Sequence, residues 1–557
     1  MSAVPLSPLS PLSALFPSRS AGDVRRALLA GQEIALLDVR EEDPHAQGHP
    51  LFAANLPLST LELQVAARLP RQSVPIVVFD AGEGLAVRAA HRLAALGYRD
   101  VALLDGGLDG WVRAGGEVFR DVNSPSKAFG ELVESQRHTP SLTAEEVQAL
   151  LAEQADVVVL DARRYDEYQT MNIPGSISVP GAELVLRAQA LAPNPATRVI
   201  VNCAGRTRSI IGTQSLVNAG LPNPVAALRN GTIGWTLAGQ TLEHGSARHA
   251  DPHTGRDAAS LSPRVAAARA LADRAGVRRT GLDETLAWAG DDSRTTYRFD
   301  VRAPAEYASA HVPGFLSAPG GQLVQETDMF APVRGARVIL IDDDGVRANM
   351  TASWLAQMNV QTFVVDAATP ADFNETGATP GAAQAAAADT DATTADTSLS
   401  CAQLAALLDD PASGTLLLDF TASARYVARH IPGAYWLLRS RLADDLRELP
   451  DAQRYVVTCG TSALARFVAP ELAALTGKPV QVLEGGTAAW IAAGLPLAGD
   501  DVSVAEAGRL ASPRIDRYRR PYEGTDNATD AMNAYLEWEY GLVAQLARDG
   551  THGFTVL

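Results

Sequence analysis

The sequence predicts an α/β protein made of four tandem copies of one unit, each a parallel sheet flanked by helices, followed by a helical C-terminal tail. Apolar β-branched runs such as 199–201 alternate with helical stretches such as 86–96 and 462–475, an order typical of α/β units on a parallel sheet. The same landmarks also recur in four places, which indicates internal repeats. At 557 residues the chain is too long for one hydrophobic core, so several domains are expected.

The first landmark is a strand that ends in aspartate, followed at a constant spacing by histidine or asparagine. The four aspartates are Asp38, Asp161, Asp300 and Asp419. The residues that follow at the constant spacing are His49, Asn172, His311 and His430. In the last three units this residue is followed by Ile-Pro-Gly or Val-Pro-Gly. Such agreement over several hundred residues indicates repetition of a structural unit rather than chance.

A second apolar strand in each unit ends at a residue whose type differs between the units. The four residues at this position are Asp80, Cys203, Asp342 and Cys459. A third strand ends, in three of the units, at a glycine that precedes a tryptophan by four positions; these tryptophans are Trp111, Trp235 and Trp490. The third unit has only Val365-Asp366 at this point.

The landmarks and the composition between them give the domain boundaries. The four units are predicted at 15–122, 141–243, 263–370 and 398–500. Residues 123–140 and 242–262 read as linkers, and the Ala/Thr/Asp/Gly-rich 371–397 is predicted to be a disordered linker. In the C-terminal extension 501–557, apolar residues over 530–548 predict an amphipathic helix that packs on a neighbouring domain.

Composition limits the partners and the compartment. The net charge of −17 argues against nucleic acid or an anionic membrane as the main partner. No apolar run is long enough to cross a membrane, and 1–18 lacks the basic and apolar regions of a signal peptide. Three cysteines form no disulfide framework in so long a chain. We therefore expect a cytoplasmic protein.

The turn after Cys203 carries the chemistry. Cys203 ends a predicted strand just before a helix, where open α/β sheets bind ligands. The loop residues are Ala204, Gly205, Arg206, Thr207, Arg208 and Ser209. Backbone N–H groups in such a turn converge on an anion. With Arg206 and Arg208 beside it, we expect Cys203 to have a lowered pKa and to be largely thiolate near neutral pH.

Together, these motifs resemble the rhodanese family of sulfurtransferases, four times over. The resemblance rests on the Asp-x-Arg strand, the His-Ile-Pro-Gly motif, the cysteine turn and the Gly-Gly-x-x-x-Trp ending, and it is most complete in the second unit. It implies a five-stranded parallel sheet and a catalytic cysteine, Cys203, that opens the active-site loop. Two departures are Gly205, which lies one position nearer to the cysteine than in many members, and Asn172 in place of histidine.

This resemblance implies a thiosulfate sulfurtransferase. The Cys203 thiolate would attack the outer sulfur of thiosulfate, release sulfite and form a persulfide. Amides from Ala204 to Ser209 would stabilise the terminal sulfur, and Arg206 and Arg208 would hold the dianionic donor. Thr207 and Ser209 would add hydroxyl donors or cap the helix. Cyanide, a thiol or an acceptor protein would receive the sulfur, and no cofactor is needed.

Two alternatives stay open from the sequence. A non-catalytic scaffold or sulfur carrier is one, because Asp80 and Asp342 cannot hold a sulfane sulfur and make two units inactive. A cysteine phosphatase is the other, although related phosphatase loops place the arginine one position later than Arg208. Cys459 is a possible second site, but no arginine follows it before Arg466.

Other candidate ligands are assigned no role. His244, His249 and His253 lie in a polar stretch without a neighbouring cysteine or strand, so we expect no metal site there. Cys401 begins a helical stretch near a linker and is taken as incidental.

Overall fold

The computed structural model describes residues 16–366, 368–377, 398–499, 509–521, 523 and 528–557. Four parallel five-stranded sheets follow one another along the chain, which confirms the predicted architecture. All four have the same strand order, β1-β5-β4-β2-β3 in the first unit and its equivalents in the others. The strand before the variable position is therefore flanked on both sides in every unit, and its end lies at the middle of the sheet edge.

The element bounds follow the repeat closely. The first unit comprises β1 (Ser18–Arg19), α1 (Ala21–Leu29), β2 (Ala35–Asp38), α2 (Glu42–Gln47), β3 (Ala53–Asn55), α3 (Leu61–Arg68), β4 (Ile76–Phe79), α4 (Leu85–Ala95), β5 (Val101–Leu104) and α5 (Gly107–Arg113). The second comprises β6 (Ser141–Leu142), α7 (Ala144–Ala152), β7 (Val157–Asp161), α8 (Tyr165–Thr170), β8 (Ile177–Ser178), α9 (Leu184–Leu191), β9 (Arg198–Asn202), α10 (Thr207–Asn218), β10 (Val225–Leu228) and α11 (Gly231–Leu237).

The last two units repeat this order. The third comprises β11 (Arg278–Thr280), α13 (Leu282–Ala289), β12 (Thr296–Asp300), α14 (Pro304–Ser309), β13 (Leu316–Ser317), α15 (Gly320–Gln325), α16 (Thr327–Phe330), β14 (Arg337–Ile341), α17 (Arg347–Gln357) and β15 (Gln361–Val365). The fourth comprises β16 (Ser398–Leu399), α19 (Cys401–Asp409), β17 (Thr415–Asp419), α20 (Ser423–Ala428), β18 (Tyr435–Trp436), α21 (Leu442–Asp445), β19 (Arg454–Thr458), α22 (Ala463–Thr476), β20 (Val480–Leu483) and α23 (Gly486–Ala492).

The Asp-x-Arg motif is a buried ion pair that ends the second strand. In the second unit, Arg163 donates to both carboxylate oxygens of Asp161, at 2.9 and 2.7 Å, and to the carbonyl of Met171 at 2.6 Å. The first and third units contain the same fork. Because each buried charge has its partner, the burial of these groups is compensated.

The histidine and tryptophan motifs fasten the chain that leaves each unit. Asn172 pairs its backbone with Glu243 (N–O distances 2.8 and 2.9 Å), and His49, His311 and His430 make the equivalent bridges. The Trp235 indole donates to the carbonyl of Thr241 at 2.9 Å, as Trp111 and Trp490 do to their own exit segments. These motifs thus serve packing, and Asn172 fills the role of histidine through its backbone.

Helices occupy parts of the segments that were read as linkers. α6 (Ser124–Arg137) lies within 123–140, and α12 (Ala258–Arg274) begins within 242–262. Residues 371–377 pack on the third unit, where the backbones of Glu375 and His311 pair. The remainder of the predicted disordered linker, 378–397, lies outside the described residues.

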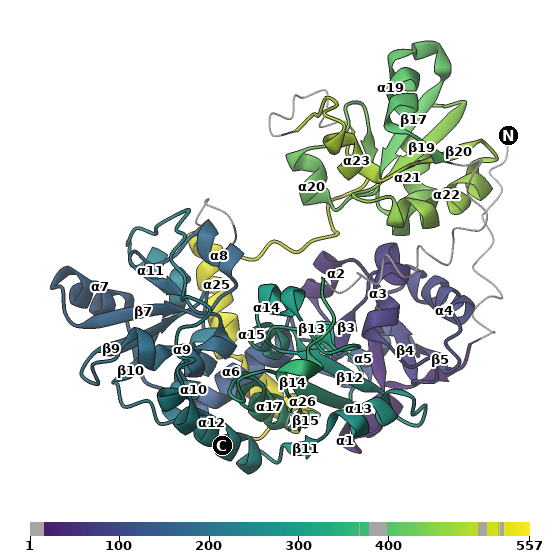
Figure 1. The fold of residues 1–557 in the computed structure, drawn as a ribbon. Coiled ribbons are helices and arrows are strands. Elements are labelled where there is room, and N and C mark those ends of the chain that lie inside the picture. The colour runs from purple at the N-terminus through teal and green to yellow at the C-terminus, as the bar shows by residue number, and fades with distance from the viewer. Residues whose placement is uncertain (1–15, 367, 378–397, 500–508, 522, 524–527) are drawn as a thin grey trace.

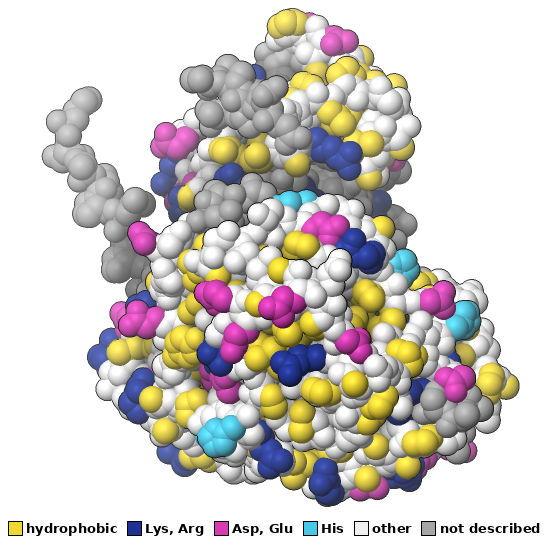
Figure 2. Space-filling view, turned by 90° about the vertical axis from the view of Figure 1, so that its left-hand side faces the viewer, with side chains coloured by type: hydrophobic (Ala, Val, Ile, Leu, Met, Phe, Trp, Pro, Cys, Tyr) yellow, Lys and Arg dark blue, Asp and Glu magenta, His cyan; other side chains and the backbone are white. Residues whose placement is uncertain are grey.

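Three units form one body, and the fourth stands beside it (Figure 1). The first and third units share a hydrophobic core, and the Tyr297 hydroxyl donates across it to the carbonyl of Arg68 at 2.7 Å. The fourth unit contacts the first through Arg439, which donates to both carboxylate oxygens of Glu62 at 2.6 and 2.9 Å. On the face shown in Figure 2, acidic and basic side chains are interspersed rather than gathered by sign.

The C-terminal tail is helical, as predicted, but it forms two helices that meet at Gly541. α25 (Thr529–Tyr540) and α26 (Leu542–Asp549) both pack against α6, and they run through the body of the three units (yellow in Figure 1). Met532, Tyr535 and Leu536 of α25 are buried against Ile233 of the second unit. The tail therefore reaches the unit that contains Cys203.

Candidate active site

The Cys203 loop joins β9 to α10 and is hydrogen-bonded to the first turn of α11. The carbonyl oxygens of Cys203 and Ala204 accept hydrogen bonds from the N–H groups of Thr232 and Ile233, at 2.9 and 3.0 Å. Gly231 has φ +54°, and a Cβ there would lie 2.2 Å from the Cys203 carbonyl oxygen. Only glycine allows this approach, which explains the glycine that precedes the tryptophan in the repeat.

In every unit, one backbone amide is directed at the side chain of the variable position. The N–H six residues further on points at the side chain of that position: Ala86 N donates to Asp80 at 2.9 Å, and Ala348 N to Asp342 at 2.7 Å. The equivalent amides of Ser209 and Ala465 are directed at Cys203 and Cys459. A second amide, of Gly82 or Gly345, also donates to each aspartate at 3.0 Å. The loop thus presents converging donors to whatever group occupies this position.

The expectation of a lowered Cys203 pKa was wrong. Cys203 is 2% exposed, and this burial raises the pKa of its thiol. The charge of Arg208 and hydrogen bonds with Ser209, whose Oγ lies 3.4 Å from Sγ, oppose the rise, whereas Glu539 of α25 adds to it. The sequence shows the arginines, but it does not show what covers the thiol.

Arg206 faces α6 rather than the solvent. Its guanidinium donates to both carboxylate oxygens of Glu131, at 2.7 and 2.9 Å, and to Glu134. It also lies 4.3 Å from the centre of the Tyr540 ring, a cation–π contact. The Arg206 side chain is 4% exposed, and its contacts join the loop to α6 and α25.

Arg208 lies at the opening of the site. It pairs with Glu167 through two hydrogen bonds of 2.9 and 2.8 Å, and this charge lowers the pKa of the glutamate to about 2 against the effect of burial. A cavity of about 390 Å³ begins at Ala204 and Arg208. Its other lining residues include Arg163, Arg164, Glu326, Arg517, Arg520 and Glu523. The cavity therefore reaches the Cys203 loop beside Arg208.

The two predicted hydroxyl donors differ. Ser209 Oγ donates to the carbonyl of Arg206 at 2.8 Å and lies beside the Cys203 sulfur. Thr207 packs against α6, where a Cβ on Gly130 would lie 2.9 Å from its methyl group. The N-cap residue of α10 is Arg206, whose side chain makes no capping hydrogen bond, so neither Thr207 nor Ser209 occupies the N-cap position.

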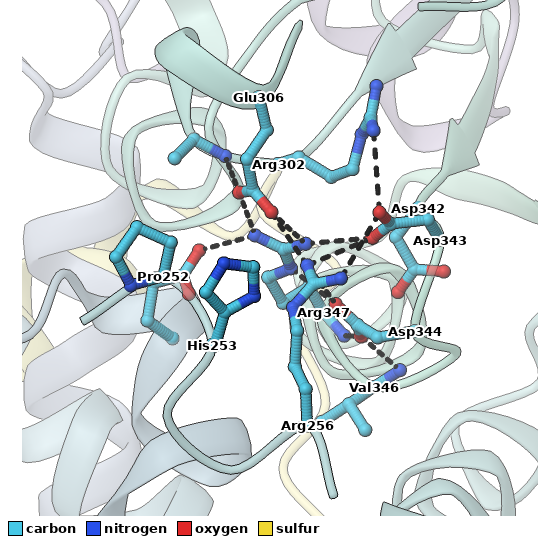
Figure 3. Close-up of polar contacts among 12 residues, drawn as sticks. Pro252, His253, Arg256, Arg302, Glu306, Asp342, Asp343, Asp344, Val346 and Arg347 are labelled. Carbon is cyan, nitrogen blue, oxygen red and sulfur yellow. Dashed lines mark hydrogen bonds and ion pairs between the residues drawn. The ribbon is translucent and has the colours of Figure 1, made fainter. Parts of the chain in front are cut away.

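Asp342 is surrounded by an ion cluster between the second and third units (Figure 3). Arg347, fully buried, donates there to Glu183, Glu306, Asp343 and Asp344 at 2.8, 2.5, 3.0 and 2.6 Å. Burial and the neighbouring Asp344 raise the pKa of Asp342 well above its usual range.

Cys459 sits in a similar loop without an arginine at the position of Arg208. It is 4% exposed, and burial raises the pKa of its thiol against the hydrogen bonds of the loop amides. Leu464 occupies the place that corresponds to Arg208. Cys401 is only partly buried and begins α19.

Sequence reasoning missed the acidic partners of the loop arginines. Glu131 and Glu134 lie in a segment read as a linker, and Glu539 lies more than three hundred positions from Cys203. Glu167 carried a detectable signal, because Glu306 occupies the same place in the third unit and pairs with Arg347, the counterpart of Arg208.

The described residues contain no group of three or more His, Cys, Asp and Glu side chains placed to hold a metal ion. His244 contacts the carbonyl of Thr170 and His249 that of Ala247, at 2.7 and 2.9 Å. Among all the residues that the structure describes, no helix is long and apolar enough to span a membrane.

Comparison with known proteins agrees with this geometry. A family model described as "Rhodanese-like domain" matches residues 20–114, 143–238 and 400–493. A crystal structure of thiosulfate sulfurtransferase from Pseudomonas aeruginosa is 62% identical, with a TM-score of 0.92, over 97% of this chain and 100% of that one. SseB of Mycobacterium tuberculosis is 28% identical over 228 residues, 33% of this chain and 78% of SseB. The family model does not match the third unit, whose sheet nevertheless has the same strand order. The chain belongs to the rhodanese family.

Proposed function

We propose that this protein transfers sulfane sulfur from thiosulfate to a thiophilic acceptor through a persulfide on Cys203. The observation that carries the proposal is the converging loop amide, which is directed at a thiol in the second unit and at a carboxyl group in the first and third. In the first and third units the equivalent loops donate hydrogen bonds to a carboxyl group. A loop of this shape in the second unit is therefore suited to a negatively charged sulfur. The similarity to a protein named thiosulfate sulfurtransferase supports a sulfurtransferase role.

The reaction proceeds in two displacements. The Cys203 thiol loses its proton, and the thiolate attacks the outer sulfur of thiosulfate. The sulfur–sulfur bond of the donor breaks, and its electron pair leaves with sulfite, so that Cys203 carries a persulfide. The acceptor, cyanide or a thiolate, then attacks the terminal sulfur, and the electron pair of the broken bond returns to Cys203 as thiolate. The loop amides stabilise the negative sulfur in both steps.

Intact mass spectrometry after treatment with thiosulfate tests the proposal. We expect the wild type to gain one sulfur atom and to lose it on addition of cyanide. The Cys459→Ser variant should behave in the same way. A mass gain confined to proteins that retain Cys459 would move the site to the fourth unit. No gain in any protein would favour the alternative that the four units act as a docking scaffold.

Arg208 is predicted to serve the donor. We expect Arg208→Ala to reduce kcat/KM for thiosulfate by about 10- to 150-fold, the ~1.5–3 kcal/mol of a hydrogen bond to a charged group, with most of the loss at low thiosulfate. Steady-state kinetics measure this, and Arg229→Ala, an exposed arginine of the same unit, is the control. Equal kinetics in both variants would show that the loop amides alone bind the donor.

A further inference from the structure

Glu539 of α25 is a buried carboxyl group with one oxygen left without a partner. Its residue is 1% exposed. Oε1 accepts a hydrogen bond from the Tyr535 hydroxyl at 2.9 Å, whereas Oε2 has no hydrogen-bond partner among the described residues. A buried carboxylate normally has its oxygens satisfied, because an unpaired buried charge is costly. The exception at Glu539 calls for a physical reason.

This unpartnered oxygen lies against the Cys203 loop. A Cβ placed on Gly205 would lie 3.3 Å from Glu539 Oε2 and 3.2 Å from Tyr535 Cε1. The absence of a side chain at Gly205 therefore lets α25 approach the loop. The glycine position that departs from many family members is the one that receives the C-terminal helix.

The charged groups around Glu539 are already committed elsewhere. From α6, Lys127 donates to Asp121 at 2.8 Å and lies over the rings of Tyr535 and Trp538, while Glu131 pairs with Arg206. From the loop, Arg206 and the Cys203 thiol face the same region. Within the described residues, neither Lys127 nor Arg206 forms an ion pair with Glu539.

This setting favours the neutral form of Glu539 at pH 7. Burial is the main cause that raises its pKa to about 8, and the charge of Glu131 adds to it, whereas Lys127, Tyr535 and Arg206 act in the opposite direction. Glu539 therefore ionises within the pH range in which enzymes are commonly assayed. Its negative form raises the pKa of Cys203 further, because like charges disfavour each other in a buried site.

We propose that Glu539, supplied by the C-terminal helix, is a positioning residue of the Cys203 site whose charge state sets how readily the loop carries a negatively charged sulfur. When Glu539 is neutral, the converging amides stabilise the thiolate without an opposing negative charge. Ionised Glu539 opposes the thiolate, the persulfide and the dianionic donor alike. The part of this inference that concerns the donor rests on the proposed function, but the part that concerns the thiol does not.

The thiol part is tested by titrating Cys203 through the ultraviolet absorbance of its thiolate, as the difference between proteins with Cys203 and with Cys203→Ser. In a Glu539→Gln background we expect the midpoint to fall by about half to one pH unit, because one unit corresponds to a tenfold change in equilibrium. Glu537→Gln, on the same helix but exposed, is the matched control. Coincident titrations of the wild type and Glu539→Gln would overturn the proposal.

The donor part is tested by the rate of persulfide formation from thiosulfate against pH. At pH 6.5 the wild type and Glu539→Gln should agree within about twofold, and at pH 9.5 the variant should be about three- to tenfold faster. Tyr535→Phe retains Glu539 but removes the hydrogen bond to it, so the break in the wild-type profile should move to higher pH. Parallel profiles in all variants would contradict a role for the charge of Glu539. A shifted thiol titration without any persulfide would instead mean that the proposed function is wrong and the inference about the thiol is right.

Discussion

Cys203→Ser is expected to abolish thiosulfate-dependent sulfur transfer while the fold stays intact. Serine is nearly isosteric and keeps a hydroxyl beside Ser209, but its oxygen is not ionised near neutral pH and cannot hold a sulfane sulfur as a persulfide. We expect the rate to fall by at least a hundredfold, which corresponds to ~2.7 kcal/mol of activation free energy. A cyanide-coupled assay of thiocyanate formation measures the loss.

Matched serine variants make this result specific. Cys459→Ser and Cys401→Ser should retain the wild-type rate, because neither thiol has an arginine in the place of Arg208. Thermal unfolding of all three variants should show similar midpoints. If Cys203→Ser keeps more than a tenth of the rate, a loss of under ~1.4 kcal/mol, Cys203 is not the main nucleophile, and Cys459 becomes the candidate.

The repeat was enough to predict the fold because its landmarks have direct structural roles. Asp161 and Arg163 form the ion pair that ends β7, Trp235 fastens the exit segment and Gly231 permits the contact beneath the loop. Each role favours one residue type at one position, so most of these residues recur where the same sheet is built. The third unit lacks the Gly–Trp ending, yet its strands pair in the same order.

The charge state of the site could not be predicted in this way. Sequence neighbours suggested that Arg206 and Arg208 would stabilise a thiolate, but their charges are balanced by Glu131, Glu134 and Glu167. The helix α25, at the far end of the chain, lies against the loop at Gly205, and the charge of its Glu539 adds to the rise in the Cys203 pKa. Electrostatics depends on which charges meet in space, and a repeat pattern carries little information about partners outside the repeat.

The segment 123–140 was expected only to link the first two units. Its helix α6 also contains buried charges, because Lys127 and Glu131 pair with Asp121 and Arg206. Composition rules treat charged residues as exposed, and they fail where each charge has a partner. The same reasoning applies to the third unit, where acidic residues cluster around one arginine.

Arg347→Met is expected to destabilise the junction of the second and third units strongly. The Arg347 guanidinium is 0% exposed and contacts four carboxylates, one of them, Glu183, from the second unit. Methionine retains much of the apolar stem but leaves these carboxylates without their shared cation. Removing one partner of a buried ion cluster costs roughly 3–5 kcal/mol, because uncompensated charge remains buried.

The remaining contacts decide how that cost is distributed. Arg187 still pairs with Glu183, and Arg256 still reaches Glu306 and Asp343, whereas Asp344 retains backbone amides and a longer contact of 3.6 Å with Arg256. Urea unfolding followed by hydrogen exchange of β9 and β14 should show a lower midpoint and faster exchange on both sides of the junction. Arg269→Met, which breaks the exposed pair with Asp366, should cost under about 1 kcal/mol. Equal effects of the two variants would show that the cluster contributes no more than a surface ion pair, and the Asp342 loop would then have no part in joining the units.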